Sequence, residues 1–255
     1  MKLRILGCGT SSGVPRIGGD WGACDPAEPR NRRLRVSILV EHGPTRILVD
    51  TGPDLREQLL TANVGDVDAV IWTHDHADHC HGIDDLRQVY HLRGHVPVLA
   101  YARPGTLDSL RARFAYAFDG AGGYSATIDS RVLPDDFTIG GVRIRAVDQP
   151  HGSIHSAGLR FDVDDRSLVY STDFNILTND MASLYKDVDV LVIDALRRAP
   201  HPTHPTLDQA IEWIAALCPK RAILTHMDQS MDYRGLCAEL PRGIEPGYDG
   251  LEVTL

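Results

Sequence analysis

The sequence contains no apolar run close to the roughly 20 residues that a membrane-spanning helix needs, so we expect no membrane contact. Its first residues pass directly into a strand pattern, without the charged segment and long apolar segment of a secretory signal. The five cysteines are odd in number and scattered, which favours free thiols over a disulfide framework. Together these absences predict a cytoplasmic protein.

Basic residues are not in excess either, because the net charge is −9 with histidine neutral. A broad nucleic-acid surface needs lysine and arginine to neutralise phosphates, so this balance argues against one while leaving room for a local basic pocket. The 255 residues have an ordinary globular composition and can bury a sizeable core. Without repeats, coiled-coil heptads or low-complexity linkers, residues 1–255 are predicted to form a single domain.

The most informative stretch is Thr73–His79, Thr-His-Asp-His-Ala-Asp-His, which follows a short apolar strand. If the extended conformation continues past Thr73, the side chains of His74, His76 and Asp78 face one way, and that of His79 must face another. A solvated polar loop is the alternative interpretation. We expect two ligand pairs for two adjacent metal ions, namely His74 with His76 and Asp78 with His79.

One loop cannot surround a metal ion, so further ligands must come from other strand ends. Three predicted strands are followed by such a residue: His151, Asp173 and His226. A single histidine at a strand end is usually a satisfied polar group, but three of them beside the 73–79 motif favour a metal site. Five histidines and two carboxylates without a thiolate suit zinc, manganese, iron or nickel, and disfavour calcium and magnesium.

Apolar periodicity predicts the remaining elements. Strands are expected over residues 3–7, 34–41, 45–50, 69–73, 96–101, 137–147 (as two strands), 159–163, 168–172, 188–194, 222–225 and 251–254. Helices are expected for about ten residues with Pro53 in the first turn, and over 84–92, 105–114 and 206–218. Thr206 and Gln209 fit a capping box at the start of the last helix. Strand-rich halves that each contain helices predict two sheets packed face to face with helices outside.

The order His-x-His-x-Asp-His, then His, Asp and His, resembles the metallo-β-lactamase superfamily. The resemblance covers nearly the whole chain and implies an αββα sandwich, an α/β fold that some schemes class as α+β. It implies that Asp173 bridges two ions, one held by His74, His76 and His151 and the other by Asp78, His79 and His226. Asp50 matches an earlier aspartate of the superfamily that orients ligands rather than binding metal. A turn-former before Gly52 is the alternative role for Asp50.

Two further segments resemble one branch of that superfamily, the PhnP-type phosphodiesterases: Gly7–Pro15 near the start and Gly247–Glu252 near the end. Those enzymes hydrolyse cyclic phosphates of ribose and some nucleotide phosphodiesters. The resemblance implies that His204 works beside the metals on the phosphodiester, and that Asp78 is catalytic as well as a ligand. His201, which is also flanked by proline, is the rival proton donor.

The chain departs from those enzymes near its N-terminus, where they can carry a Cys-x-Cys-x-x-Cys structural zinc site. Only Cys24 is present, and Gln229 stands where a histidine would complete the site. One soft ligand cannot form a tetrahedral site, so we predict no third, structural metal. Whether the loop around Trp21 takes the place of that site or closes over substrate is left open.

We therefore predict a metal-dependent hydrolase, a phosphodiesterase that acts on small cyclic or nucleotide phosphodiesters through a metal-bridging hydroxide. His204 would protonate the leaving alkoxide. The expected cofactors are two divalent ions, with zinc or manganese favoured and iron or nickel as alternatives. The expected partner is a small phosphodiester such as a cyclic ribose phosphate or a nucleotide, and a homodimer is left open.

Two other functions are compatible with the motifs. A tRNA 3′-end endonuclease of the same superfamily is opposed by the acidic balance and by the lack of a long basic exosite arm. A non-catalytic binding protein similar to the pyrroloquinoline-quinone pathway B proteins shares the N-terminal opening. That alternative is disfavoured because all seven ligand positions are filled here.

Overall fold

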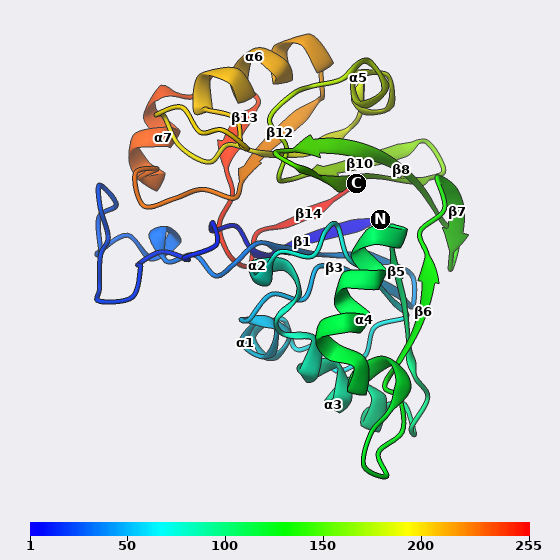
Figure 1. The fold of residues 1–255 in the computed structure, drawn as a ribbon. Helices are drawn as coiled ribbons and strands as arrows, with labels where there is room; N and C mark the ends of the chain where they lie inside the picture. Colours follow the sequence, from blue (N-terminus) through cyan, green and yellow to red (C-terminus); the bar gives the residue numbers. More distant parts are fainter.

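The computed structural model describes all residues from 1 to 255, which form two seven-stranded sheets packed face to face with helices on the outside (Figure 1). This arrangement confirms the αββα sandwich predicted from the sequence. None of the helices is both long and apolar enough to cross a bilayer.

The first half of the chain supplies most of one sheet and the helices that cover it. Its elements are β1 (Lys2–Gly7), η1 (Pro29–Asn31), β2 (Ser37–His42), β3 (Thr45–Val49), α1 (Leu55–Ala62), β4 (Ala69–Ile71), α2 (Ala77–Cys80), η2 (Ile83–Asp85), α3 (Leu86–Leu92), β5 (Val98–Ala102), α4 (Pro104–Asp119) and β6 (Ile128–Val132). The second half supplies β7 (Asp136–Ile139), β8 (Val142–His151), β9 (Ile154–Val163), β10 (Arg166–Ser171), α5 (Asn179–Tyr185), β11 (Val190–Asp194), α6 (Leu207–Leu217), β12 (Arg221–Thr225), α7 (Tyr233–Glu239), β13 (Ile244–Pro246) and β14 (Glu252–Thr254).

Both sheets change from antiparallel to parallel pairing along their width. The first has the order β14-β1-β2-β3-β4-β5-β6 and is parallel from β3 onward. The second has the order β13-β12-β11-β10-β9-β8-β7 and is parallel from β10 to β13. Because β8 and β10 are both antiparallel to β9, their carboxyl ends lie at the same edge as those of β11 and β12. This edge collects the polar residues that follow the strands.

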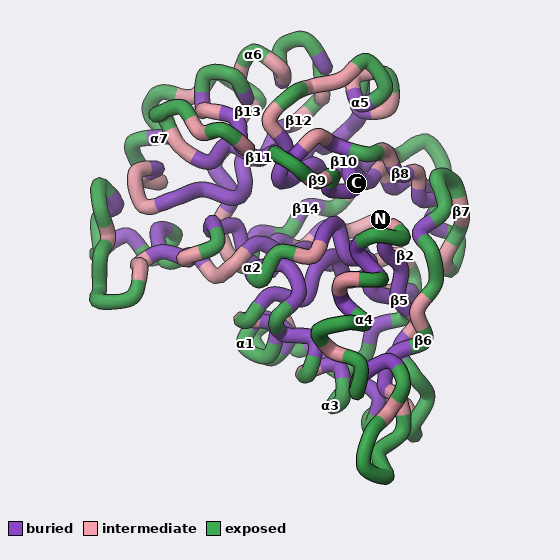
Figure 2. Tube along the Cα trace, viewed as in Figure 1, coloured by how far each residue is buried: buried purple, intermediate pink, exposed green.

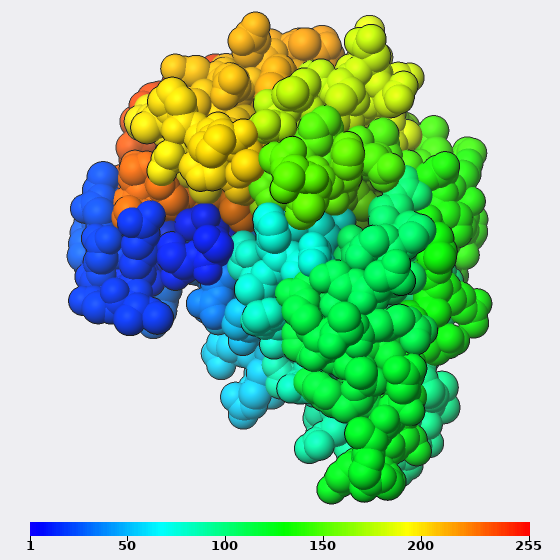
Figure 3. All heavy atoms as spheres, viewed as in Figure 1, coloured from blue at the N-terminus to red at the C-terminus, as the bar shows by residue number.

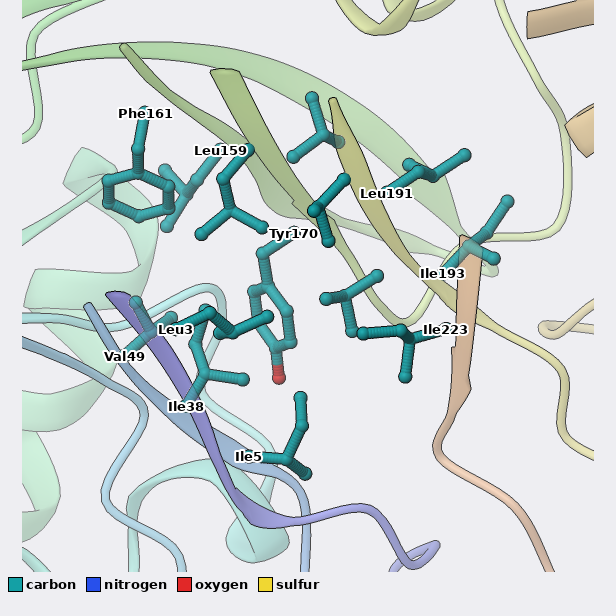
Figure 4. Packing of buried hydrophobic residues seen from close by; sticks show 14 of the residues in the cluster. Leu3, Ile5, Ile38, Val49, Leu159, Phe161, Tyr170, Leu191, Ile193 and Ile223 are labelled. Atoms are coloured by element: carbon teal, nitrogen blue, oxygen red, sulfur yellow. The ribbon is translucent and has the colours of Figure 1, made fainter. Parts of the chain in front are cut away.

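The core lies between the sheets and under the outer helices. Apolar side chains of both sheets meet in one large buried cluster, in which Leu3 and Ile38 of the first sheet face Tyr170 and Leu159 of the second (Figure 4). A smaller cluster lies between the first sheet and α1, α3 and α4. Buried residues accordingly follow the strands, whereas the outer helices and loops are largely exposed (Figure 2). The strands are therefore held rigidly from both faces.

Some local predictions were wrong. The extended conformation does not continue past Thr73, because β4 ends at Ile71 and the motif turns into α2. Asp78 and His79 are therefore neighbours on a helical turn rather than on a strand. Pro53 precedes α1 instead of lying in its first turn. The pattern analysis also missed two short helices and two edge strands, α5, α7, β6 and β13.

Residues between β1 and β2 form an arm that projects beside α7, shown in blue at one end of the molecule (Figure 3). The arm is anchored around Arg33, which is 1 % exposed. Its guanidinium donates to the carbonyls of Asp228 and Met231, at 3.1 and 2.5 Å, and lies 3.8 Å from the Cys24 sulfur. The loop around Trp21 is thus tied by hydrogen bonds to the segment that follows His226.

Candidate metal centre

All seven residues predicted as metal ligands lie at the edge where the strand ends of the two sheets meet. Their ligand atoms form compact groups, within 4.8 Å of one another in each: His74, His76, His151 and Asp173, then Asp78, His79 and His226, and also Asp173, His204 and His226. His76 is the exposed member of the seven, whereas the other six are buried. The cluster is therefore open to solvent on the side of His76.

Asp173 lies between the two groups that the sequence predicts. One of its carboxylate oxygens, Oδ1, is 3.6 Å from His151 Nε2 and 3.6 Å from His226 Nε2. The other, Oδ2, is 3.2 Å from His79 Nε2. A single carboxylate therefore faces histidines of both groups, which is the position that a bridging ligand requires.

The donor atoms fit divalent ions. The Nε2 atoms of His74, His79 and His226 are buried and have no hydrogen-bond partner in the protein. An unpaired buried imidazole nitrogen is unfavourable unless another group satisfies it. Nitrogen donors combined with carboxylates suit zinc, manganese, iron or nickel. The histidine and aspartate groups could therefore bind such ions.

The pKa values within the cluster are displaced in opposite directions. Burial and the neighbouring imidazoles hold the pKa of His74 well below its usual range. Burial is the largest influence on His79 and His226 and opposes their charged forms, but the surrounding carboxylates, Asp173 first among them, together outweigh it and raise both pKa values, that of His226 to about 9. Desolvation alone would raise the pKa of Asp78 and Asp173, yet the imidazoles hold both well below their usual range. Both carboxylates are therefore ionised at neutral pH and can accept a cation.

Asp50 forms hydrogen bonds with residues of the Thr73–His79 motif. It is fully buried and adopts a positive φ of 64° at the end of β3. Its Oδ2 lies 2.7 Å from His79 Nδ1, and its Oδ1 accepts from the Thr73 main-chain N–H at 2.8 Å. The Thr73 hydroxyl also lies 3.1 Å from His74 Nδ1. These contacts favour the orienting role over that of a simple turn-former.

The remaining ligand of the first group, His151, is oriented by a backbone carbonyl. Its Nδ1 lies 3.0 Å from the carbonyl oxygen of Thr203, which can only accept, so Nδ1 carries the hydrogen. The lone pair of Nε2 is left facing His76 Nδ1, at 3.3 Å. This hydrogen bond therefore holds the loop that carries Thr203 against His151, a member of the first predicted ligand group.

His204 lies beside the cluster, with its ring stacked on that of His226 at 4.8 Å. Its Nε2 is 3.8 Å from Asp173 Oδ1, and its Nδ1 is 2.7 Å from Asp194 Oδ2. The sequence reasoning missed Asp194, which it treated as the last residue of an apolar strand. Asp194 ends β11 at the same edge as the predicted ligands, and the Asp173 main-chain N–H donates to it at 3.0 Å. Its place at a strand end was the signal that could have found it.

The rival proton donor, His201, has different contacts from those of His204. Its Nδ1 accepts from the Thr203 main-chain N–H at 3.3 Å. Its ring centre is 5.0 Å from that of His204. No contact between His201 and the seven predicted ligands is seen, so the structure favours His204 as the residue next to the cluster.

A cavity of about 640 Å³ lies beside the motif and the β8–β9 turn, although none of the seven predicted ligands lines it. Its wall includes Asp75, between two ligands of the motif, and Ile154, which pairs with His151 across the β8–β9 turn. The other lining residues are Arg103, Pro104, Gly105, Thr106, Asp135, Asp148 and His155. The lining is mostly polar, with carboxylates and a single apolar residue.

Comparison with known proteins identifies a matching family model and several similar proteins. The family model described as "Beta-lactamase superfamily domain" matches residues 45–227. Among solved structures, a diphosphatase from the PhnP family is 34% identical, with a TM-score of 0.91 over 100% of this chain and 97% of the other. Zinc-bound PqqB from Methylobacterium extorquens is 20% identical, with a TM-score of 0.78 over the whole of both chains, and shows the fold alone. An octanoyltransferase from Porphyromonas gingivalis is 32% identical over 100% of this chain, which spans only 52% of that protein.

Proposed function

This chain belongs to the metallo-β-lactamase superfamily, and we propose that within it the protein is a metal-dependent phosphodiesterase acting on small cyclic or nucleotide phosphodiesters. The observation that carries the proposal is the Asp173 carboxylate between two histidine groups, with His204 and its partner Asp194 beside it. We assign one ion to His74, His76 and His151, a second to Asp78, His79 and His226, and a bridging role to Asp173. When bound, two divalent ions would supply a nucleophile at neutral pH and neutralise charge on the phosphate.

The chain's own residues account for the departure of the alcohol. An alkoxide is a poor leaving group until it is protonated, and a positioned imidazole can supply the proton. Asp194 accepts from His204 Nδ1, which fixes the orientation of the ring. The proton on Nε2 is then directed to the side of the ring that faces Asp173.

The cavity beside Asp75 supports a small, hydroxylated alcohol. Its wall is polar apart from one residue, so side-chain and backbone groups there can form hydrogen bonds with the hydroxyls of a ribose. The cavity therefore supports a nucleotide or ribose phosphate as the substrate.

A phosphoanhydride is the second candidate substrate, because the PhnP-family neighbour at 34% identity is a diphosphatase. The two chemistries differ in the leaving group. A phosphate leaves without prior protonation far more readily than an alkoxide, so an acid beside the cluster matters less for an anhydride. The close contact of His204 with Asp194 is the observation that favours the phosphodiester.

The test is a turnover assay on metal-reconstituted protein with a 2′,3′-cyclic nucleotide, bis(p-nitrophenyl) phosphate and a dinucleoside diphosphate. We expect the cyclic nucleotide to be opened, activity to disappear with a chelator, and zinc or manganese to restore it. Asp173→Asn should abolish the metal-dependent rate. A metal-loaded protein that opens neither phosphodiester would refute the proposal. Turnover of the diphosphate alone would favour the second candidate, and salt-sensitive tRNA cleavage would favour the nuclease.

A further inference from the structure

Gln149 is a fully buried polar residue that lies two positions before His151 on β8 and outside the metal cluster. Its Oε1 accepts from the hydroxyls of Ser171, at 2.5 Å, and Tyr185, at 2.8 Å. Its Nε2 donates to the Ser156 hydroxyl at 2.8 Å and the Thr172 carbonyl at 2.9 Å. The two N–H donors and the two acceptor positions of the amide are therefore all used.

These hydrogen bonds connect two strands that carry ligands but do not touch each other. His151 ends β8 and Asp173 follows β10, with β9 between them. Ser156 of β9 lies opposite Gln149 and donates to the carbonyl of Asp173 at 2.7 Å. Gln149 thus reaches the carbonyl before Asp173 directly and the carbonyl of Asp173 through Ser156. Asp173 has a positive φ of 58°, which a non-glycine residue adopts only when its surroundings hold it there.

The network extends to α5 through Tyr185, which is also fully buried. The tyrosine hydroxyl reaches Gln149 because Gly158 on β9 has no side chain. A β-carbon at Gly158 would lie 1.6 Å from the Tyr185 hydroxyl oxygen and 2.6 Å from Gln149 Oε1. The close approach of α5 to β8 and β9 therefore depends on the residue types at three positions, Tyr185, Gly158 and Gln149.

We propose that Gln149 is a positioning residue that sets the separation of His151 and Asp173, and with it the affinity of this metal group for its ion. The two ligand atoms lie 3.6 Å apart on strands that Gln149 and Ser156 hold in register. Apolar packing alone would fill the same volume without fixing the carbonyls around Asp173, whereas a fully satisfied buried network specifies one geometry. The inference rests on the metal site of the proposed function.

The test is equilibrium zinc binding by the full chain, measured by competition with a chromophoric chelator well below the melting temperature of each variant. Gln149→Met keeps the volume and removes all four hydrogen bonds, so we expect its zinc dissociation constant to rise about tenfold or more, as for residues that orient ligands. Tyr185→Phe removes one hydrogen bond, and we expect a smaller rise in the same direction. Zinc bound per chain at saturation and the melting temperature are measured in parallel.

Tyr170→Phe is the matched control. Tyr170 is as buried as Tyr185, but its hydroxyl has no hydrogen-bond partner and lies among Leu3, Ile5 and Ile38 (Figure 4). We expect this variant to bind zinc like the unmodified chain.

Unchanged zinc affinity in both Gln149→Met and Tyr185→Phe would overturn the inference, whatever their melting temperatures. If Gln149→Met does not fold, Tyr185→Phe compared with Tyr170→Phe decides alone. Absence of zinc binding by the unmodified chain would instead refute the metal site of the proposed function, and the inference would fall with it.

Discussion

Two imidazoles in one short loop, His201 and His204, have different surroundings although each is next to a proline. The Nδ1 of His204 is paired with the buried Asp194, and its Nε2 faces Asp173. The Nδ1 of His201 is engaged by the Thr203 main chain instead. The sequence alone offered both as proton donors, since the choice depends on Asp194, a residue on a different strand.

His204→Ala should lower the rate of opening of a cyclic nucleotide by about 10²–10⁴-fold, the usual contribution of a positioned general acid. Bis(p-nitrophenyl) phosphate should lose much less, because p-nitrophenolate leaves without protonation. Steady-state kinetics of both substrates, with metal content measured in the same samples, check this expectation. His201→Ala is the control and should leave both rates within about threefold. Equal losses on the two substrates would remove His204 from the role of acid.

The pKa values of the cluster predict how metal affinity depends on pH. Burial opposes protonation of His79 and His226, but the surrounding carboxylates, Asp173 first among them, together raise both pKa values, that of His226 to about 9. At neutral pH an incoming ion must therefore displace protons, and binding should strengthen as pH rises toward about 9. Zinc titration between pH 6 and 9 should show the affinity rising by up to about tenfold per pH unit for each proton released. The exposed variant His155→Gln should show the same slope, and a flat profile would contradict the prediction.

At the element scale, α6 was predicted almost to its ends because its signals are local. The Thr206 hydroxyl accepts from the Gln209 main chain at 3.2 Å, and the Gln209 side chain accepts from the Thr206 N–H at 2.9 Å. The motif after β4 could not be predicted in the same way. Its turn is held by distant residues, since the Thr51 N–H donates to His79 and the Gly82 N–H donates to Thr51. Strand alternation therefore selected residues that do lie in one cluster, but with the wrong local geometry.

The capping box gives a direct test of the local part of this argument. Thr206→Ala removes the hydroxyl that accepts from the first turn of α6 and should lower the free energy of unfolding by about 1 kcal/mol. Thr206→Ser keeps an acceptor and should stay near the unmodified value. Urea unfolding followed by circular dichroism compares the two variants. Equal stabilities for both would show that tertiary packing rather than the cap holds this helix.

Over the whole molecule, the candidate site joins the two sheets that sequence reasoning could only predict as layers. His74 and His76 come from the loop after β4 and Asp78 from α2, whereas His151 ends β8, and Asp173 and His226 follow β10 and β12 of the second sheet. The strand ends and residue types were readable from the sequence. The contacts that hold them in place, such as that of Gln149 with Thr172, cross strands and leave no periodic pattern. The first and last strands are likewise paired, with Lys2 opposite Thr254.

Because the predicted ligands come from both halves of the sandwich, metal binding should stabilise all of it. An ion that binds only the folded state adds stability that grows with its concentration, by about 4.1 kcal/mol at a thousand times the dissociation constant. We expect a chelator to lower the melting temperature and added zinc to restore it, as measured by differential scanning calorimetry. Asp173→Asn removes the carboxylate that faces both groups, and should reduce this zinc-dependent increase more than His76→Gln, which changes the exposed ligand of one group. A melting temperature that changes with neither the chelator nor zinc would mean that the apolar core alone holds the two sheets together.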